Sequence, residues 1–281
     1  MAKIALSCES TVDLTKELIK ENNIHVVPFT VVLGNKSGYD GDITSSEIIS
    51  YVKKHNQLPK TAAVNTFQYE EHFSKLLKEY DSVIHISLSS EISCAYNNAM
   101  EVAKEMKNVF VIDSQSLSTG IALLALYARK LIDSGMDAFD IVDAVSKRRT
   151  SVQASFILSR LDYLYKGGRC NSISYLASTL LKIRPQIILT NGRMEPRKKY
   201  VGKFEKGVFK YVNDTLGYFN HPDLENIFIT YTTADDAVVN EIKEILKKRG
   251  FKNIYPTHAG ATITSHCGEN CLGILYINDG K

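Results

Sequence analysis

The first half of the chain repeats one pattern, a short apolar run followed by an amphipathic stretch, and this repeat constrains the fold more than any other feature. The apolar runs, which are typical of buried strands, span 4–6, 26–27, 83–86 and 109–112. Helical spacing of apolar residues occupies 13–20, 45–54, 66–78 and 94–106. Strands that alternate with helices pair in parallel and carry helices on both faces. The pattern therefore predicts an α/β fold with an open, mostly parallel sheet.

The second half is less regular and predicts a mixed α/β arrangement. Before it, helices are expected at 117–134 and 138–149. Within it, helices are expected at 203–219 and 234–249, and strands at 152–158, 187–190, 227–231, 253–255 and 272–277. Asn191-Gly192 is a strong hairpin turn. At 281 residues the chain is long for one compact domain. We expect an N-terminal α/β domain over 1–150 and a C-terminal mixed α/β domain over 151–281.

Composition excludes several classes of protein. The net charge of +3 is too small to indicate a nucleic-acid partner, and no helix-turn-helix pattern is found. No stretch approaches the roughly 20 apolar residues that span a bilayer, and no signal peptide is recognisable. The five cysteines are widely spread and odd in number, which is typical of reduced thiols in a cytoplasmic protein.

Three predicted strands end in small, hydroxyl-rich segments, at 7–10, 87–93 and 113–116. In a parallel sheet these segments lie together at the carboxyl edge, where open α/β sheets bind ligands. Each precedes a predicted helix, whose first N–H groups favour an anion. The edge therefore indicates a carboxylate or phosphate site. The alternative is that these Ser and Asp side chains only cap the helices.

Two further residues are candidates for contact with an anion. Thr61 lies in a predicted loop at 58–63, and His266 lies among small residues before a strand. Either could equally be structural. With His258, Cys267 and Cys271, His266 also suggests zinc, but a C-x₃-C spacing disfavours it. No metal site is therefore expected.

Catalytic motifs are missing from the sequence. Gly167-Gly168 could form a phosphate loop, yet no P-loop or dinucleotide fingerprint is present. No nucleophile elbow and no H-E-x-x-H is present either. These absences argue modestly against a hydrolase.

The segment LDYLYKGGR at 161–169 resembles the L-x-x-L-x-K-G-G-R signature of the DegV family. Other landmarks follow in the family's order and span essentially the whole chain. They are Lys60-Thr61, SLSSEISCAYNNA, VIDS at 111–114, RPQII at 184–188, GRMEPRKKYVGK, and the terminal HAG and SHCG elements. The sequence departs from the family pattern mainly near the expected head group, at 62–65, 94–95 and 267–270.

The resemblance implies two α/β domains with a long-chain fatty acid in a tunnel between them. It implies that Thr61 and Ser93 hold the carboxylate and that His266 makes a third contact. A separate ATP-binding subunit of a fatty-acid kinase would phosphorylate that carboxylate, so this chain would be a carrier and not an enzyme, with no cofactor besides the bound acid. Transient contact with a membrane would suit such a carrier. Further residues could support the residues that contact the carboxylate, or could face the acyl phosphate or the kinase. They are Ala62, Ser90, Cys94, Ser114, Arg169, Arg193, Arg197, Cys267 and Gly268.

A tail of about fifteen carbons would gain roughly 12 kcal/mol before entropy costs, so the tail would supply affinity and the head group orientation. Apolar residues that could line its tunnel are Phe29, Phe156, Leu158, Leu161, Leu164, Leu176 and Ile188. Each could equally belong to the ordinary core. The main alternative function is a dihydroxyacetone-kinase-like enzyme subunit in which His266 attaches covalently to substrate.

Overall fold

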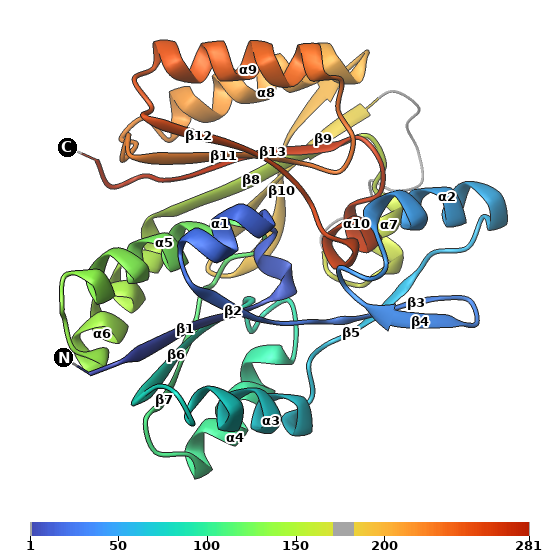
Figure 1. Cartoon of the computed structure of the whole chain (residues 1–281). Helices are drawn as coiled ribbons and strands as arrows, with labels where there is room; N and C mark the ends of the chain where they lie inside the picture. The colour runs from blue at the N-terminus through green and yellow to red at the C-terminus, as the bar shows by residue number, and fades with distance from the viewer. Residues whose placement is uncertain (1, 171–182, 281) are drawn as a thin grey trace.

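The computed structural model describes residues 2–170 and 183–280. Its strands form three sheets, which we call the parallel sheet, the small sheet and the mixed sheet. In Figure 1 the mixed sheet lies above the parallel sheet, with helix α5 between them and the small sheet to one side. The predicted fold class, a parallel sheet joined to a mixed α/β half, is confirmed.

The parallel sheet has the order β2-β1-β6-β7, and all its pairs are parallel. Its strands are β1 (Ile4–Glu9), β2 (Ile24–Val27), β6 (Ser82–Ser87) and β7 (Val109–Asp113). Its helices are α1 (Lys16–Glu21), α3 (Thr66–Leu76), α4 (Ala95–Glu105), α5 (Thr119–Asp133) and α6 (Ala138–Arg148). Strands β1, β6 and β7 therefore end at one edge, as the sequence predicts.

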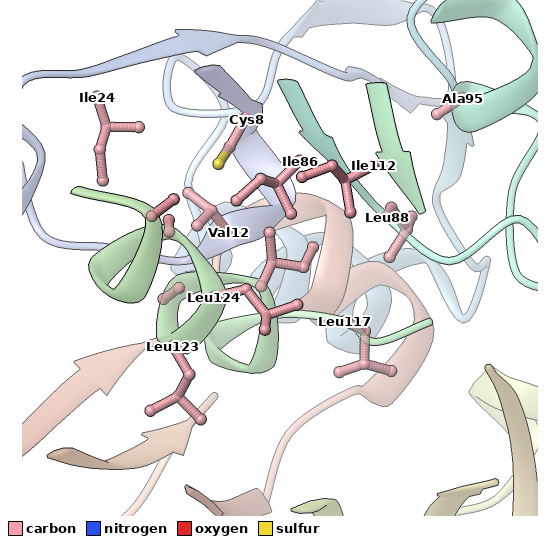
Figure 2. Close-up of a cluster of buried hydrophobic side chains, with 14 of the residues drawn as sticks. Cys8, Val12, Ile24, Ile86, Leu88, Ala95, Ile112, Leu117, Leu123 and Leu124 are labelled. Atoms are coloured by element: carbon pink, nitrogen blue, oxygen red, sulfur yellow. The ribbon is translucent and has the colours of Figure 1, made fainter. Parts of the chain in front are cut away.

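Strand β1 is longer than predicted, because Ser7, Cys8 and Glu9 continue it and do not begin a loop. Alternation along the strand directs Ser7 and Glu9 to one face of the sheet and Cys8 to the other. Figure 2 shows Cys8, Ile86 and Ile112 in one apolar cluster with Leu124 of α5. The polar side chains of β1 consequently lie on the opposite face, and they are fully buried there.

The small sheet was not predicted. It consists of β3 (Thr30–Leu33), β4 (Lys36–Tyr39) and β5 (Lys60–Ala62), which pair antiparallel in the order β4-β3-β5 beside helix α2 (Ser45–His55). These strands are only three or four residues long, and β4 is mostly exposed, so they carry little periodic signal. Thr61, predicted in a loop, is therefore in a strand.

The mixed sheet has the order β10-β9-β8-β13-β11-β12, and β11–β12 is its one parallel pair. Its strands are β8 (Val152–Leu158), β9 (Ile183–Thr190), β10 (Arg193–Val201), β11 (Asn226–Tyr231), β12 (Asn253–His258) and β13 (Cys271–Ile277). Helices α8 (Phe204–Tyr218) and α9 (Asp236–Lys248) lie over one face, and α5 packs on the other. Asn191-Gly192 forms the turn between β9 and β10 as predicted.

One apolar cluster joins the two halves, since it includes Ile86 of the parallel sheet and Phe156 and Leu275 of the mixed sheet. Helix α5 contacts strands of both sheets. The domain boundary near residue 150 stays a prediction. In the described part of the chain, no helix is long and apolar enough to cross a membrane.

No helix was predicted around His266. Residues Ala261–Cys267 form helix α10, and the short helix α7 (Asp162–Lys166) lies against it. Carboxylates of the first half hold the start of α10. The Gly260 N–H donates to Asp13 Oδ1 at 2.8 Å, and the Ala261 N–H donates to Asp40 Oδ1 at 2.8 Å. Burial raises the pKa of Asp13 to about 8.

Candidate ligand-binding site

A cavity opens where α10, β5 and the loop from β6 to α4 meet. The space between its walls, part of it open to solvent, measures about 520 Å³. Three of its residues, Thr61, Ser93 and His266, are those that the resemblance assigns to a carboxylate. The remaining wall is formed by Phe29, Ala63, Leu88, Ile92, Leu117, Arg169, Met194, Thr262, Ile263 and Cys267. A few polar groups thus lie at one place in an otherwise largely apolar wall.

A second, more apolar cavity of about 330 Å³ lies between the start of α5 and the mixed sheet. It shares Leu117, Ile263 and Cys267 with the first cavity, so the two adjoin at these side chains. Its other wall residues are Ser118, Phe156, Thr230, Tyr231, Thr232, Ala259, Cys271, Gly273 and Leu275. The polar residues Thr61, Ser93 and His266 line the first cavity and not the second.

Thr61 and His266 share a hydrogen bond of 2.8 Å between Oγ1 and Nε2. Among the residues that the structure describes, none hydrogen-bonds to the other ring nitrogen, Nδ1. Burial, and secondarily the charge of Arg169, lower the pKa of His266 to about 4. The imidazole is therefore neutral at pH 7, with one nitrogen available to a ligand or a water.

The double glycine has a steric role beside this ring. A Cβ at Gly167 would lie 2.7 Å from Nδ1 of His266, closer than any side chain allows. Gly168 adopts a φ of +68°, a backbone region that glycine tolerates best. The chain then turns so that Arg169 lines the cavity and donates from Nη1 to the Gly167 carbonyl at 2.6 Å. The signature segment thus packs against the polar end of the cavity.

Ser93 precedes α4, and its Oγ accepts a hydrogen bond from the Ala95 N–H at 3.2 Å. Its own hydroxyl proton is free to donate elsewhere. The loop that carries Ser93 is fixed from two sides. Ser89 accepts the Ser93 N–H on its carbonyl at 3.2 Å, and its hydroxyl donates to the carbonyl of Gly192 at 2.8 Å. The β9–β10 turn therefore supports the loop that carries the site.

A buried carboxylate network lies behind the same loop. Glu9 accepts hydrogen bonds from Tyr69 at 2.7 Å, Ser87 at 2.6 Å and the Leu88 N–H at 3.0 Å, and it contacts Nε2 of His85 at 3.1 Å. Burial alone would raise the pKa of Glu9, but His85 and these hydrogen bonds outweigh it and hold the pKa below its ordinary value. The strand-end segment at 7–10 thus supports the loop and does not line the cavity.

Other predicted residues at this edge are occupied by local contacts. The Ser90 hydroxyl donates to Asp113 at 2.6 Å, and Ser114 donates to the Ser116 carbonyl at 3.2 Å. Ala62 is exposed, on the face of β5 opposite to Thr61. Cys94 is exposed immediately before α4.

The remaining four predicted residues come from the second half of the chain. Arg193 forms an exposed ion pair of 2.7 Å with Glu91, and Arg197 lies 3.4 Å over the ring of Tyr218. Cys267 lines both cavities. Gly268 has a φ of +70°, where a Cβ would collide with the Tyr163 ring.

The predicted tail residues divide into two groups. Phe29 lines the first cavity and Phe156 lines the second. Four others that the structure describes line neither cavity: Leu158 and Leu164 are fully buried, Leu161 packs on the core, and Ile188 is half-buried. Leu176 lies outside the described residues.

Sequence reasoning missed several wall residues, above all Thr262 and Ile263 on α10 and Met194 on β10. A helical interpretation of 261–267 would have placed Ile263 and Cys267 on one face, four residues apart. Among the described residues, no group of three or more His, Cys, Asp or Glu side chains could hold a metal ion. Burial raises the pKa of the Cys271 thiol well above its ordinary range.

Largely apolar cavities with a few polar groups in their walls are typical of small-molecule-binding sites. The model of the family described as "Uncharacterised protein, DegV family" matches residues 3–279. The chain belongs to the DegV family.

Relatives match over nearly their whole length. A DegV domain-containing protein of Caldanaerobacter subterraneus subsp. tengcongensis is 28% identical, over 98% of this chain and 99% of its own. A DegV lipid-binding protein from Thermotoga maritima is 26% identical, with a TM-score of 0.86 and coverage of 99% of this chain and 100% of that one. DegV of Bacillus subtilis, a fatty acid binding protein, is 26% identical, with a TM-score of 0.86 and coverage of 99% of both chains.

Proposed function

We propose that this chain binds a long-chain fatty acid, with its carboxylate at Thr61, Ser93 and His266 and its tail in the two adjoining cavities. The observation that carries the proposal is the pair of adjoining, largely apolar cavities, the first of which contains the hydrogen-bonded Thr61 and His266. The solved relatives from Thermotoga maritima and Bacillus subtilis, described as lipid and fatty acid binding, support the same ligand class.

The polar end suits a carboxylate because it offers hydrogen-bond donors. A buried carboxylate without partners would cost several kcal/mol and would take up a proton. The Ser93 hydroxyl can donate, and the Thr61–His266 pair supplies one further proton to the ligand. Either Thr61 donates to the ligand while it accepts from Nε2, or Thr61 donates to Nε2 and Nδ1–H donates to the ligand. Arg169 adds a positive charge in the same wall. These groups orient the acid at one end of the cavity.

The apolar cavities supply most of the affinity in this proposal. Each buried CH₂ contributes about 0.8 kcal/mol, whereas a hydrogen bond exchanged with water contributes about 1 kcal/mol. Leu117, Ile263 and Cys267, at the junction of the cavities, would contact the middle of the chain.

We further propose that the protein does no chemistry itself and presents the acid to an ATP-binding fatty-acid kinase subunit in the cytoplasm. The basic strand β10, with Arg193 and Arg197, and the cavity residue Arg169 would face that partner or the acyl phosphate. Transient contact with a membrane would deliver the acid. The thiols of Cys8, Cys94, Cys267 and Cys271 fit a reducing compartment.

The test is direct detection of the ligand. Denaturing mass spectrometry of the purified protein should release an acid of roughly 14 to 18 carbons, enough to fill an elongated apolar site. After delipidation, palmitate at about 100 times its Kd should stabilise the protein by about 2.7 kcal/mol. Methyl palmitate, which has no carboxylate, should stabilise it less.

Phe139→Ala serves as the matched control, because this apolar side chain is exposed on α6 and lines neither cavity. It should retain lipid as the unchanged protein does. ATP alone should leave the bound acid unmodified. Recovery of lipid-free protein that palmitate does not stabilise would contradict the proposal, and a covalent ketose adduct on His266 would favour the enzyme alternative.

A further inference from the structure

One polar group of the cavity has no role in the binding scheme above. Thr262 on α10 lines the first cavity and is 3% exposed. Its backbone N–H donates to Asp40 Oδ2 at 3.1 Å, but among the described residues none hydrogen-bonds to its Oγ1.

A buried hydroxyl without a partner is costly, because it has lost its water and gained nothing. An unsubstituted acyl chain cannot relieve that cost. The hydroxyl lies in the same cavity as His266, one helical turn earlier, which corresponds to an axial rise of roughly 6 Å. Thr262 lines the cavity that contains the polar groups and not the second cavity, so it lies nearer to the carboxyl end of the proposed ligand than to the tip of its tail.

We infer that this site is built for a long-chain acid that carries a hydroxyl group on one of its first carbons, such as a 3-hydroxy acid, and that Thr262 binds that hydroxyl. The inference rests on the proposed fatty-acid function and narrows its substrate class. Thr262 can both donate and accept, as the ligand hydroxyl can, so the pair satisfies each other. Several other residues of the cavity wall, such as Phe29 and Ala63, have no side-chain group that could hydrogen-bond to the ligand hydroxyl.

Sites that hydrogen-bond a ligand hydroxyl discriminate strongly against the analogue that lacks it, because the protein group is then left unpaired. The discriminating quantity is the ratio of the Kd for palmitate to the Kd for 3-hydroxypalmitate. Thr262→Val removes the hydroxyl and preserves the branched shape and the backbone bond to Asp40. We expect this substitution to lower the ratio about tenfold.

Two further variants isolate the cause. Thr262→Ser keeps a hydroxyl and should keep the ratio of the unchanged protein. Thr61→Val should weaken both acids to a similar extent, because it acts on the carboxylate that they share, and so should leave the ratio unchanged. Thermal unfolding of each variant verifies that it is folded.

Measurement by isothermal titration of the delipidated full-length protein with each acid decides the matter. A ratio that stays within about twofold between the unchanged protein and Thr262→Val, while palmitate still binds, would overturn this inference and leave the proposed function standing. Failure of the unchanged protein to bind either acid would overturn both.

Discussion

Behind the loop that joins β6 to α4 lies the Glu9 network, and in front of it lies the cluster of Thr61, Ser93 and His266. Both clusters are polar groups set among apolar side chains. Glu9 is fully buried and each of its oxygens is occupied by protein donors. In the second cluster Nδ1 of His266 has no partner among the described residues, and the nearby hydroxyl of Thr262 has none either.

The difference separates a structural polar cluster from a binding one. Buried polar groups that fold the protein are satisfied by the protein. Groups that await a ligand are left incomplete beside a cavity. From the sequence, the strand-end motif at 7–10 and the residues Thr61 and His266 are equally good candidates for a ligand site. Only the number of hydrogen bonds that each makes to the protein distinguishes them. Changes in the first cluster should therefore reduce stability, and changes in the second should reduce affinity.

The largest expected effect is on the Glu9 network. Glu9→Ala should lower the free energy of unfolding by about 3–5 kcal/mol, because it leaves His85, Tyr69 and Ser87 buried without their acceptor. Urea denaturation measures the change. Glu244→Ala is the control, since its ion pair with Lys247 is exposed and should contribute at most about 1 kcal/mol. If both variants lost a similar free energy of unfolding, the Glu9 network would not be the structural cluster that we describe.

The second-largest expected effect is a dependence of the free energy of unfolding on pH, which comes from His266. Folding lowers its pKa from 6.5 to about 4, so the unfolded chain binds this proton more readily. Stability should fall by up to about 3 kcal/mol as pH drops from 6.5 to 4, in the absence of ligand. His266→Gln should lose that portion of the slope. The contribution of Glu9, whose pKa is lowered, persists until the pH falls below its ordinary range. Chemical denaturation at several pH values tests this, and identical slopes would refute it.

The smallest expected change in stability is at Thr61. Thr61→Val removes the hydroxyl that His266 contacts and should weaken palmitate binding about tenfold, or about 1.4 kcal/mol. The free energy of unfolding should change by less than about 1 kcal/mol, because the residue lies in a short, partly exposed strand. Titration and denaturation of one preparation give both numbers. A variant that loses stability but keeps its affinity for palmitate would show that Thr61, like Glu9, has a structural role and not a binding role.

Much of the fold could be predicted from periodicity, because β1, β6, β7 and the long helices carry full apolar runs or faces. The small sheet could not, since three strands of three or four residues show no period. Helix α10 was missed because its seven residues include two threonines and a serine, which favour no helical stripe.

The site was less accessible to sequence reasoning than the fold. Thr61 and His266 are 205 positions apart, and their 2.8 Å contact is visible only in space. Phe29 and Phe156 reach the cavities, whereas Leu158 and Leu164 are equally apolar and buried elsewhere. Orientation relative to a cavity depends on tertiary packing, which composition does not encode.

The fastening of α10 has a consequence for how the molecule is made. The bond from Gly260 to Asp13 joins residues 247 positions apart, and the ligand-facing side of the cavity depends on the helix that this bond anchors. Domains generally begin to fold from the N-terminus during synthesis, and contacts of such long range form late. During synthesis the parallel sheet would therefore be largely assembled while the apolar cavity is still open to solvent. The cavity would close only after α10 has been synthesised and its first residues have bonded to Asp13.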